Sequence, residues 1–392
     1  LHGIARGRGV RAPGPPTAAA VCAALAPDEA ALAYYWVADD LLVAVAADQA
    51  GLDVARVTVD RREQRDLAAY AAALGRGERS ARPFADFFRR LGPVLFPPEV
   101  RGRVEGKRRL AVSPHRALHL VPFHAVDWDG EPLVEHVAVR YVPNLGALLR
   151  PWAGPCAGPG AGAGGAPVLS VGCGAFDDPD AAARPLADAE PEAREVAAAY
   201  AAAGRAADVL VGADATRAAL QALGDRLPAY GVAHLATHAL SVLAPERADD
   251  PLAARLYLRD GPLDGIGVAA LGLRAELVVL AACHSAQRAV AGRGFAAVPG
   301  DELFGFPAVL FEGGVRCVLG ALWPASSEPA RPIMRRLHAG VAAGDLPDVA
   351  LQQALRAHRA AGSEDAFDLL HWAPYYLAEL GRPSPSRPSA DA

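Results

Sequence analysis

The sequence predicts an α/β fold with a mostly parallel sheet flanked by helices, and two observations support this prediction. Short, β-branched apolar runs, clearest at residues 277–283, lack the alternation of a half-exposed strand. Such runs are typical of strands that are buried on both faces. From residue 167 to residue 381 they alternate with helical patterns, which requires a parallel sheet covered on both sides.

The N-terminal part of the chain predicts one unit, over residues 21–150. We expect strands at 31–38 and 41–46, joined by a turn at Asp39 and Asp40, then a helical region around 61–91 and a strand at 109–112. Residues 1–20 are rich in Gly, Pro and Arg and are predicted to be disordered.

A glycine-rich segment divides the chain. Residues 154–166 read GPCAGPGAGAGGA, so we place a linker at 151–166 and a second unit at 167–381. The tail, 382–392, is predicted to be disordered. The second unit is expected to contain strands at 168–171, 209–211, 230–237, 277–283, 317–323 and 375–377, with helices at 187–203, 217–223, 302–312, 329–342 and 347–360.

Composition narrows the class of protein. The chain is 52% hydrophobic with a formal net charge of −5 and lacks a long basic block, so nucleic acid is not an expected partner. No apolar stretch approaches the roughly 20 residues that span a bilayer, so no membrane is expected either. Five scattered cysteines without CxxC spacing argue against disulfides and structural zinc and favour a reducing, cytoplasmic setting.

The candidate reactive residues are Cys283 and His238, each at the end of a predicted buried strand. Open α/β sheets place their reactive groups beyond the carboxyl ends of their strands. A cysteine nucleophile needs a base and donors for the oxyanion, so we predict His238 as base and the backbone N–H groups of Ala239 and Cys283 as donors. The competing interpretation is that Cys283 is a buried structural thiol.

Other residues near His238 and Cys283 in the sequence allow further hypotheses. His234 and His238 have the spacing of a zinc-binding helix, but Leu235 stands where that motif needs Glu and the segment reads as strand, so no metal is predicted. We interpret the run at 172–174, which contains Cys173, as a turn. His284 is expected to line a pocket or to be exposed. Asp301 is expected to cap a helix or to line an acidic pocket.

Five segments, in the correct order, resemble a CHAT domain, the caspase-like family related to separases: residues 118–126 (LHLVPFHAV), 234–238 (HLATH), 280–283 (LAAC), 313–324 (GGVRCVLGALWP) and 371–375 (HWAPY). The resemblance implies a caspase-like fold with a catalytically empty N-terminal half. It also implies a bacterial cysteine endopeptidase that uses His238 and Cys283, needs no cofactor and is activated by a regulatory or sensor partner.

The substrate implied is a protein or peptide. By the same resemblance Asp301, with His284 and Trp323, forms the candidate substrate pocket, Asp301 receiving Arg or Lys. The chain departs from the family pattern at Ala239, where Gly is usual, and at His284–Ala286 and Ala325–Glu328. Two alternatives stay open: a non-catalytic interaction module of caspase-like fold, and cysteine chemistry on a small molecule.

Overall fold

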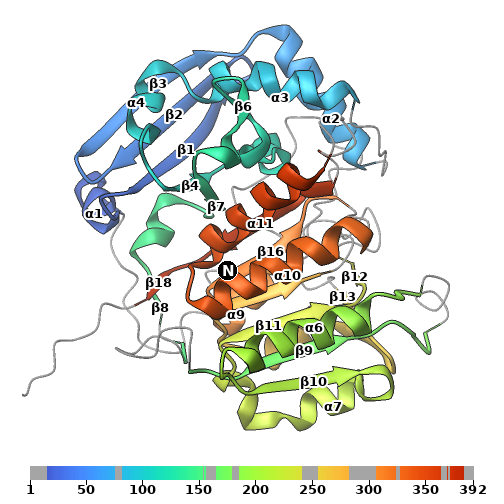
Figure 1. The fold of residues 1–392 in the computed structure, drawn as a ribbon. Coiled ribbons are helices and arrows are strands. Elements are labelled where there is room, and N and C mark those ends of the chain that lie inside the picture. Colours follow the sequence, from blue (N-terminus) through green and yellow to red (C-terminus); the bar gives the residue numbers. More distant parts are fainter. Residues whose placement is uncertain are drawn as a thin grey trace, which may run out of the picture.

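The computed structural model describes residues 16–75, 82–152, 154–155, 165–178, 185–240, 255–281, 306–323, 327–362, 369 and 371–383. Within these residues one mixed sheet of eleven strands runs through the whole molecule (Figure 1). In spatial order its strands are β10 (Ala207–Val211), β9 (Val168–Gly172), β11 (Val232–Ala236), β15 (Leu277–Leu280), β16 (Cys317–Ala321), β17 (Tyr375–Glu379), β7 (Ala138–Tyr141), β4 (Arg109–Ser113), β1 (Glu29–Ala38), β2 (Leu41–Asp48) and β3 (Gly51–Thr58).

The sheet contains two parallel blocks that run in opposite directions. The strands β10, β9, β11, β15 and β16 are parallel to one another. Strand β17 is antiparallel to β16 and parallel to β7, β4 and β1. The carboxyl ends of the first block therefore lie at the edge of the sheet opposite to those of β17, β7, β4 and β1.

Helices cover both faces, as the apolar strand pattern requires. One face carries α2 (Arg61–Gly75), α3 (Arg82–Leu95), α4 (Pro98–Val104), α6 (Ala189–Ala202), α10 (Ser327–Ala343) and α11 (Pro347–Ala361), and Figure 1 shows α6, α10 and α11 side by side. The other face carries α1 (Ala18–Ala24), α7 (Arg217–Ala222), α8 (Gly265–Ala270) and α9 (Phe306–Gly313). Strand residues alternate between the two layers: Val232 faces the first and Ala233 the second.

Smaller elements complete the described chain. A three-stranded sheet contains β12 (Ala239–Leu240), β13 (Arg255–Leu258) and β14 (Gly261–Asp264). Two further sheets have two strands each. One pairs β5 (Asp127–Trp128) with β6 (Glu131–Pro132), and the other pairs β8 (Pro151–Trp152) with β18 (Arg382–Pro383). Short 3-10 turns lie at Arg116–Leu120, Phe123–Ala125, Leu133–Glu135, Leu145–Leu149, Gly212–Asp214 and Gly224–Ala229.

The structure differs from the sequence-based expectation in several elements. Strands β3 and β7 were not predicted, and the helical region expected around 61–91 contains two helices, α2 and α3. Helix α1 begins at Ala18, capped by Thr17, whose hydroxyl accepts the N–H of Ala20 at 3.2 Å, so residues 16–20 are not disordered. The expected linker and tail also contribute order, because β8 pairs with β18. The rest of the two terminal segments lies outside the described residues.

A network of ion pairs fills the seam between the two halves of the sheet. Arg140 on β7 is 1% exposed and pairs with Glu29 on β1, Glu379 on β17 and Asp348 on α11. Burial alone would raise the pKa of Glu29, but the charge of Arg140, with those of Arg382 and Arg109, lowers it to about 2. Charged side chains thus hold together strands that come from both halves of the sequence.

Candidate active site

Strands β11 and β15 lie side by side and parallel, in a constant register. Val232 pairs with Leu277 and Leu235 pairs with Leu280, and the Ala281 N–H donates to the Leu235 carbonyl at 3.1 Å. Each residue of β11 therefore faces the residue 45 positions later in the sequence. His238 follows the end of β11 by two residues, at the carboxyl edge of the first parallel block.

The structure describes only part of the site expected from the sequence. His238, Ala239 and Trp323 are among the described residues. Cys283, His284 and Asp301 lie outside them, so their roles stay predictions. The described chain reaches Ala281, two residues before Cys283 in the sequence.

Two neighbouring segments fix the surroundings of His238. Its carbonyl accepts the backbone N–H of Tyr257, on β13, at 2.9 Å. The hydroxyl of Thr237 donates to the carbonyl of the same Tyr257. On the other side the imidazole of His238 stacks on Phe176, with ring centroids 5.0 Å apart and planes inclined by 30°.

Ala239, the predicted oxyanion donor, is buried on strand β12. It faces Leu256 across the antiparallel pair with β13. Because the Tyr257 N–H donates to the carbonyl of His238, Ala239 and Leu256 occupy a non-hydrogen-bonded position of the ladder. In such a position the backbone N–H is directed away from the partner strand. The N–H of Ala239 therefore points away from β13.

Cys173 lies at the same edge, because its backbone N–H donates to the carbonyl of Ala236 at 2.9 Å. Its side chain is fully buried, and its thiol donates to the carbonyl of Ala175 at 3.4 Å. Burial raises the pKa of the Cys173 thiol to about 11, against smaller lowering effects that include a hydrogen bond with Thr237. A thiol with such a pKa carries little thiolate at neutral pH, which favours a packing role for Cys173.

Trp323, proposed from the sequence as a pocket residue, follows β16 by two residues. Its side chain is 6% exposed and belongs to the hydrophobic core that α10 and α11 cover. This position is near the carboxyl end of the strand next to β15. The described contacts thus give Trp323 a packing role, and contact with a substrate stays a prediction.

His234 faces away from the strand end, into the layer below α6 and α10. Its Nε2 is 3.1 Å from Oε1 of Glu192, and its Nδ1 is 3.0 Å from Nε2 of His338, whose Nδ1 is 3.0 Å from the hydroxyl of Tyr200. Burial, and then the neighbouring His234, lowers the pKa of His338 well below its ordinary value. The two histidines of the HLATH segment therefore do not form a joint site.

Phe176, Glu192 and His338 are among the residues of these contacts that the sequence did not indicate. None carries a local signal, since each is an ordinary apolar or polar position of its loop or helix. Among the described residues, no group of three His, Cys, Asp or Glu side chains is arranged to hold a metal ion. No helix in the described part of the chain has the length and apolar character needed to cross a membrane.

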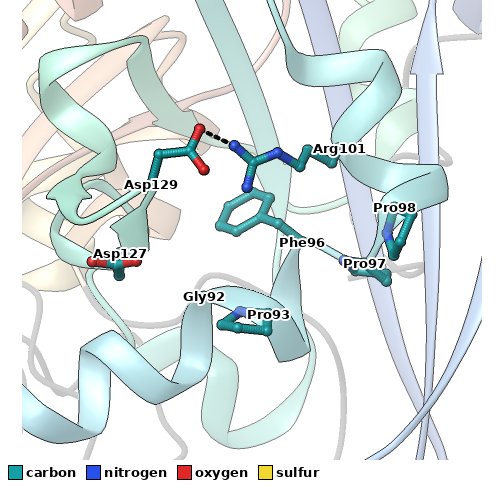
Figure 2. Close-up of a pocket in the computed structure, with 8 residues that line it drawn as sticks. All are labelled: Gly92, Pro93, Phe96, Pro97, Pro98, Arg101, Asp127 and Asp129. Carbon is teal, nitrogen blue, oxygen red and sulfur yellow. Dashed lines mark hydrogen bonds and ion pairs between the residues drawn. The ribbon is translucent and has the colours of Figure 1, made fainter.

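A cavity of about 400 Å³ lies in the N-terminal half, between α3, α4 and the β5–β6 pair (Figure 2). Its apolar wall includes Phe96 and three prolines. Its charged groups have partners within the protein: Arg101 pairs with Asp129 and lies 4.2 Å from the ring centroid of Trp128, and Asp127 accepts the N–H of Gly130. We assign no reaction to this cavity.

Comparison with solved structures shows the fold. The chain is similar to separase in a separase–securin complex from Saccharomyces cerevisiae, with a TM-score of 0.55 and 7% identity, covering 92% of this chain and 30% of the separase chain. It thus spans about a third of the length of that relative. A second similarity, to the Arg-specific cysteine proteinase gingipain R, has a TM-score of 0.42 and 8% identity, covering 83% of this chain and 76% of the other. The fold is caspase-like.

Comparison with protein families is more specific. No curated protein sequence matches the chain. The family model of the CHAT domain matches residues 85–379, which include β4, both strands that lead toward the candidate site, and β17. This match covers most of the sequence and confirms the resemblance of the five motif segments. The chain belongs to the CHAT domain family.

Proposed function

We propose that this chain is a cysteine endopeptidase that cleaves a protein substrate, with His238 as base and Cys283 as nucleophile. The observation that carries the proposal is the register of β11 and β15. Paired residues of these strands are 45 positions apart, which is also the separation of His238 and Cys283 in the sequence. Neighbouring parallel strands therefore lead toward the two residues at one edge of the sheet.

The reaction follows from the properties of these groups. His238 removes the proton of the Cys283 thiol, and the thiolate attacks the carbonyl carbon of the peptide bond, forming a C–S bond. The backbone N–H groups of Ala239 and Cys283 bind the oxyanion, and the N–H of Ala239 is directed away from β13, as a donor to a ligand must be. The imidazolium gives its proton to the leaving amine, and water then hydrolyses the thioester.

Substrate choice and activation are further parts of the proposal. Asp301, with His284 and Trp323, forms the pocket for the residue before the cleaved bond, and a carboxylate there selects Arg or Lys. We also propose that a protein partner activates the enzyme in the cytoplasm. The similar separase chain was solved in complex with securin, which supports a protein partner by analogy of fold alone.

Cleavage and labelling of purified variants test the proposal. The wild type is incubated with fluorogenic peptides bearing Arg, Lys or Asp before the scissile bond, and separately with iodoacetamide, with the modified cysteine located by mass spectrometry. We expect fast alkylation of Cys283, and cleavage after Arg or Lys at the basal rate of the enzyme without its activating partner. Cys283→Ala abolishes cleavage, and His238→Ala slows alkylation of Cys283 because the thiolate is no longer formed by the imidazole.

Cys22→Ala is the matched control. Cys22 lies in helix α1 and is buried against the N-terminal part of the sheet. It should leave both cleavage and alkylation of Cys283 unchanged. Peptide cleavage that persists in Cys283→Ala refutes the peptidase proposal. Slow alkylation of Cys283 that does not depend on His238 favours a non-catalytic interaction module instead.

A further inference from the structure

The loop after strand β9 places an aromatic ring against the imidazole of the predicted base. We propose that Phe176 is a positioning residue that holds the His238 imidazole in one plane for proton transfer, an inference that rests on the proposed function. Two rings whose centroids are 5.0 Å apart, with an angle of 30° between their planes, are in a stacked arrangement. The stack restricts the plane of the imidazole ring, whereas the backbone contacts of His238 restrict only the position of its main chain.

The backbone of His238 is held by strand β13. Tyr257 makes two of the contacts, since its N–H donates to the His238 carbonyl and its own carbonyl accepts the hydroxyl of Thr237. These bonds fix the position of the Cα atom of His238. They act on the backbone, whereas the plane of the ring is set by the terminal torsion of the side chain, which is broad for histidine. A neighbouring flat surface is one way to select a single plane.

Phe176 is itself immobilised, as a positioning residue must be. Its side chain is 7% exposed and packs in the core on the α7–α9 face of the sheet. The loop is tied on both sides of it: the Asp177 N–H donates to the carbonyl of Arg259 at 2.8 Å, and the Leu186 N–H donates to that of Gly174 at 3.0 Å. A Cβ on Gly174 would lie 2.6 Å from the Leu186 carbonyl oxygen, so the loop packs tightly there.

The stack bears on the proposed reaction in two ways. It limits rotation of the ring, as proton transfer in a fixed geometry requires. The face of Phe176 also carries partial negative charge, which favours the imidazolium formed when the base takes up a proton. An aromatic contact of this kind corresponds to an effect of about two- to tenfold on a rate.

The first experiment tests the geometry without requiring catalysis. Histidine side-chain resonances of the full chain are recorded by NMR, and His238→Gln assigns those of His238. A ring stacked on the imidazole shifts these resonances upfield. We expect Phe176→Leu to abolish that shift and Phe176→Tyr to retain it. If the His238 resonances are the same in Phe176→Leu as in the wild type, the inference is overturned.

The second experiment tests the role in the reaction. The rate of Cys283 alkylation by iodoacetamide, and kcat and KM for a fluorogenic Arg or Lys peptide, are measured in both variants. We expect Phe176→Leu to lower kcat and the alkylation rate about two- to tenfold with KM unchanged, and Phe176→Tyr to restore them. Unchanged rates in Phe176→Leu, with the NMR shift lost, overturn the positioning role.

Phe96→Leu is the matched control for a general loss of packing. Phe96 is also buried, 4% exposed, and packs edge-on against Trp128 in the N-terminal half. It should lower stability without changing kcat or the alkylation rate, and an equal fall of kcat in this variant overturns the positioning role. If wild-type alkylation of Cys283 is independent of His238, the proposed function fails, while the NMR result still decides whether Phe176 holds the ring.

Discussion

Arg140 supplies the positive charge at the centre of the seam between the two halves, and replacing it with methionine tests how that seam is held. The guanidinium pairs with Glu29 and Glu379, and its Nη1 is 3.4 Å from Oδ2 of Asp348. All four side chains are buried. Methionine keeps much of the volume and removes the charge, so the variant leaves three buried carboxylates with less compensation.

The expected cost is roughly 3–5 kcal/mol of folding free energy, the range for removing one partner of a buried ion pair. The pKa of Glu29 corresponds to an energy of the same order. The pKa of Glu29 is lowered from 4.5 to about 2, with Arg140 as the largest of the charges that oppose burial. One pKa unit corresponds to about 1.36 kcal/mol, so the charges of Arg140, Arg382 and Arg109 together exceed the cost of burying this carboxylate by about 3 kcal/mol.

The assay is urea unfolding followed by circular dichroism, at several pH values. A carboxyl with a lowered pKa stabilises the folded state above its unfolded pKa, and this contribution is lost as pH falls from about 4.5 toward 2. In Arg140→Met the carboxyls lose much of that advantage, so the difference in unfolding free energy between variant and wild type should shrink as the pH falls from about 4.5 toward 2.

Arg356→Met is the control, because Arg356 is half-exposed and pairs with Glu135 at the surface, with Nε 2.9 Å from Oε2. An exposed pair of this kind contributes about 0–1 kcal/mol. If Arg140→Met costs no more than Arg356→Met at pH 7, or if its cost does not depend on pH, the buried charges do not hold the seam and the reasoning is refuted.

Two other predictions concern packing and thiol reactivity. Gly92→Ala should destabilise the protein by about 1–3 kcal/mol in urea unfolding, because its Cβ would lie 2.5 Å from the carbonyl oxygen of Asp127. Gly102→Ala is the control. It has open space at its Cβ and should stabilise α4 by about 0.5–1 kcal/mol. Equal effects would contradict the described contact. Cys173 should resist iodoacetamide at pH 7.5 in the folded protein and react in 8 M urea, as mass spectrometry can show, because burial raises the pKa of its thiol to about 11. Rapid labelling without urea would mean that the loop opens.

The C-terminal half of the fold could be predicted from the sequence because its strands are plain apolar runs. Strands β11 and β15 are buried throughout and aliphatic except at His234, and both were found where the sequence indicated them. Strand β7 was missed for the opposite reason. It has four residues, and one of them is Arg140, whose partners are more than 100 residues away in the sequence. No local pattern can show that such an arginine is buried.

At the candidate site, too, some features could be predicted from the sequence and others could not. Strand ends and their order predicted the position of His238, because the alternation of strands and helices constrains which ends share an edge. The ring against His238 could not be predicted, since Phe176 belongs to a loop that only the sheet order brings beside β11.

Strand β3 was missed because Asp53 and Arg56 interrupt its apolar residues at the edge of the sheet.

The ion pairs of the seam also bear on how the chain can fold. The N-terminal half contributes Glu29, Arg109 and Arg140, and the C-terminal half contributes Glu276, Arg316, Asp348, Glu379 and Arg382. The first set carries one net positive charge and the second one net negative charge. Each half on its own would leave one of these charges without compensation, so it would need water at this surface if it were made alone. The two halves should therefore unfold in one cooperative step, and two separately expressed fragments should gain order when they are mixed.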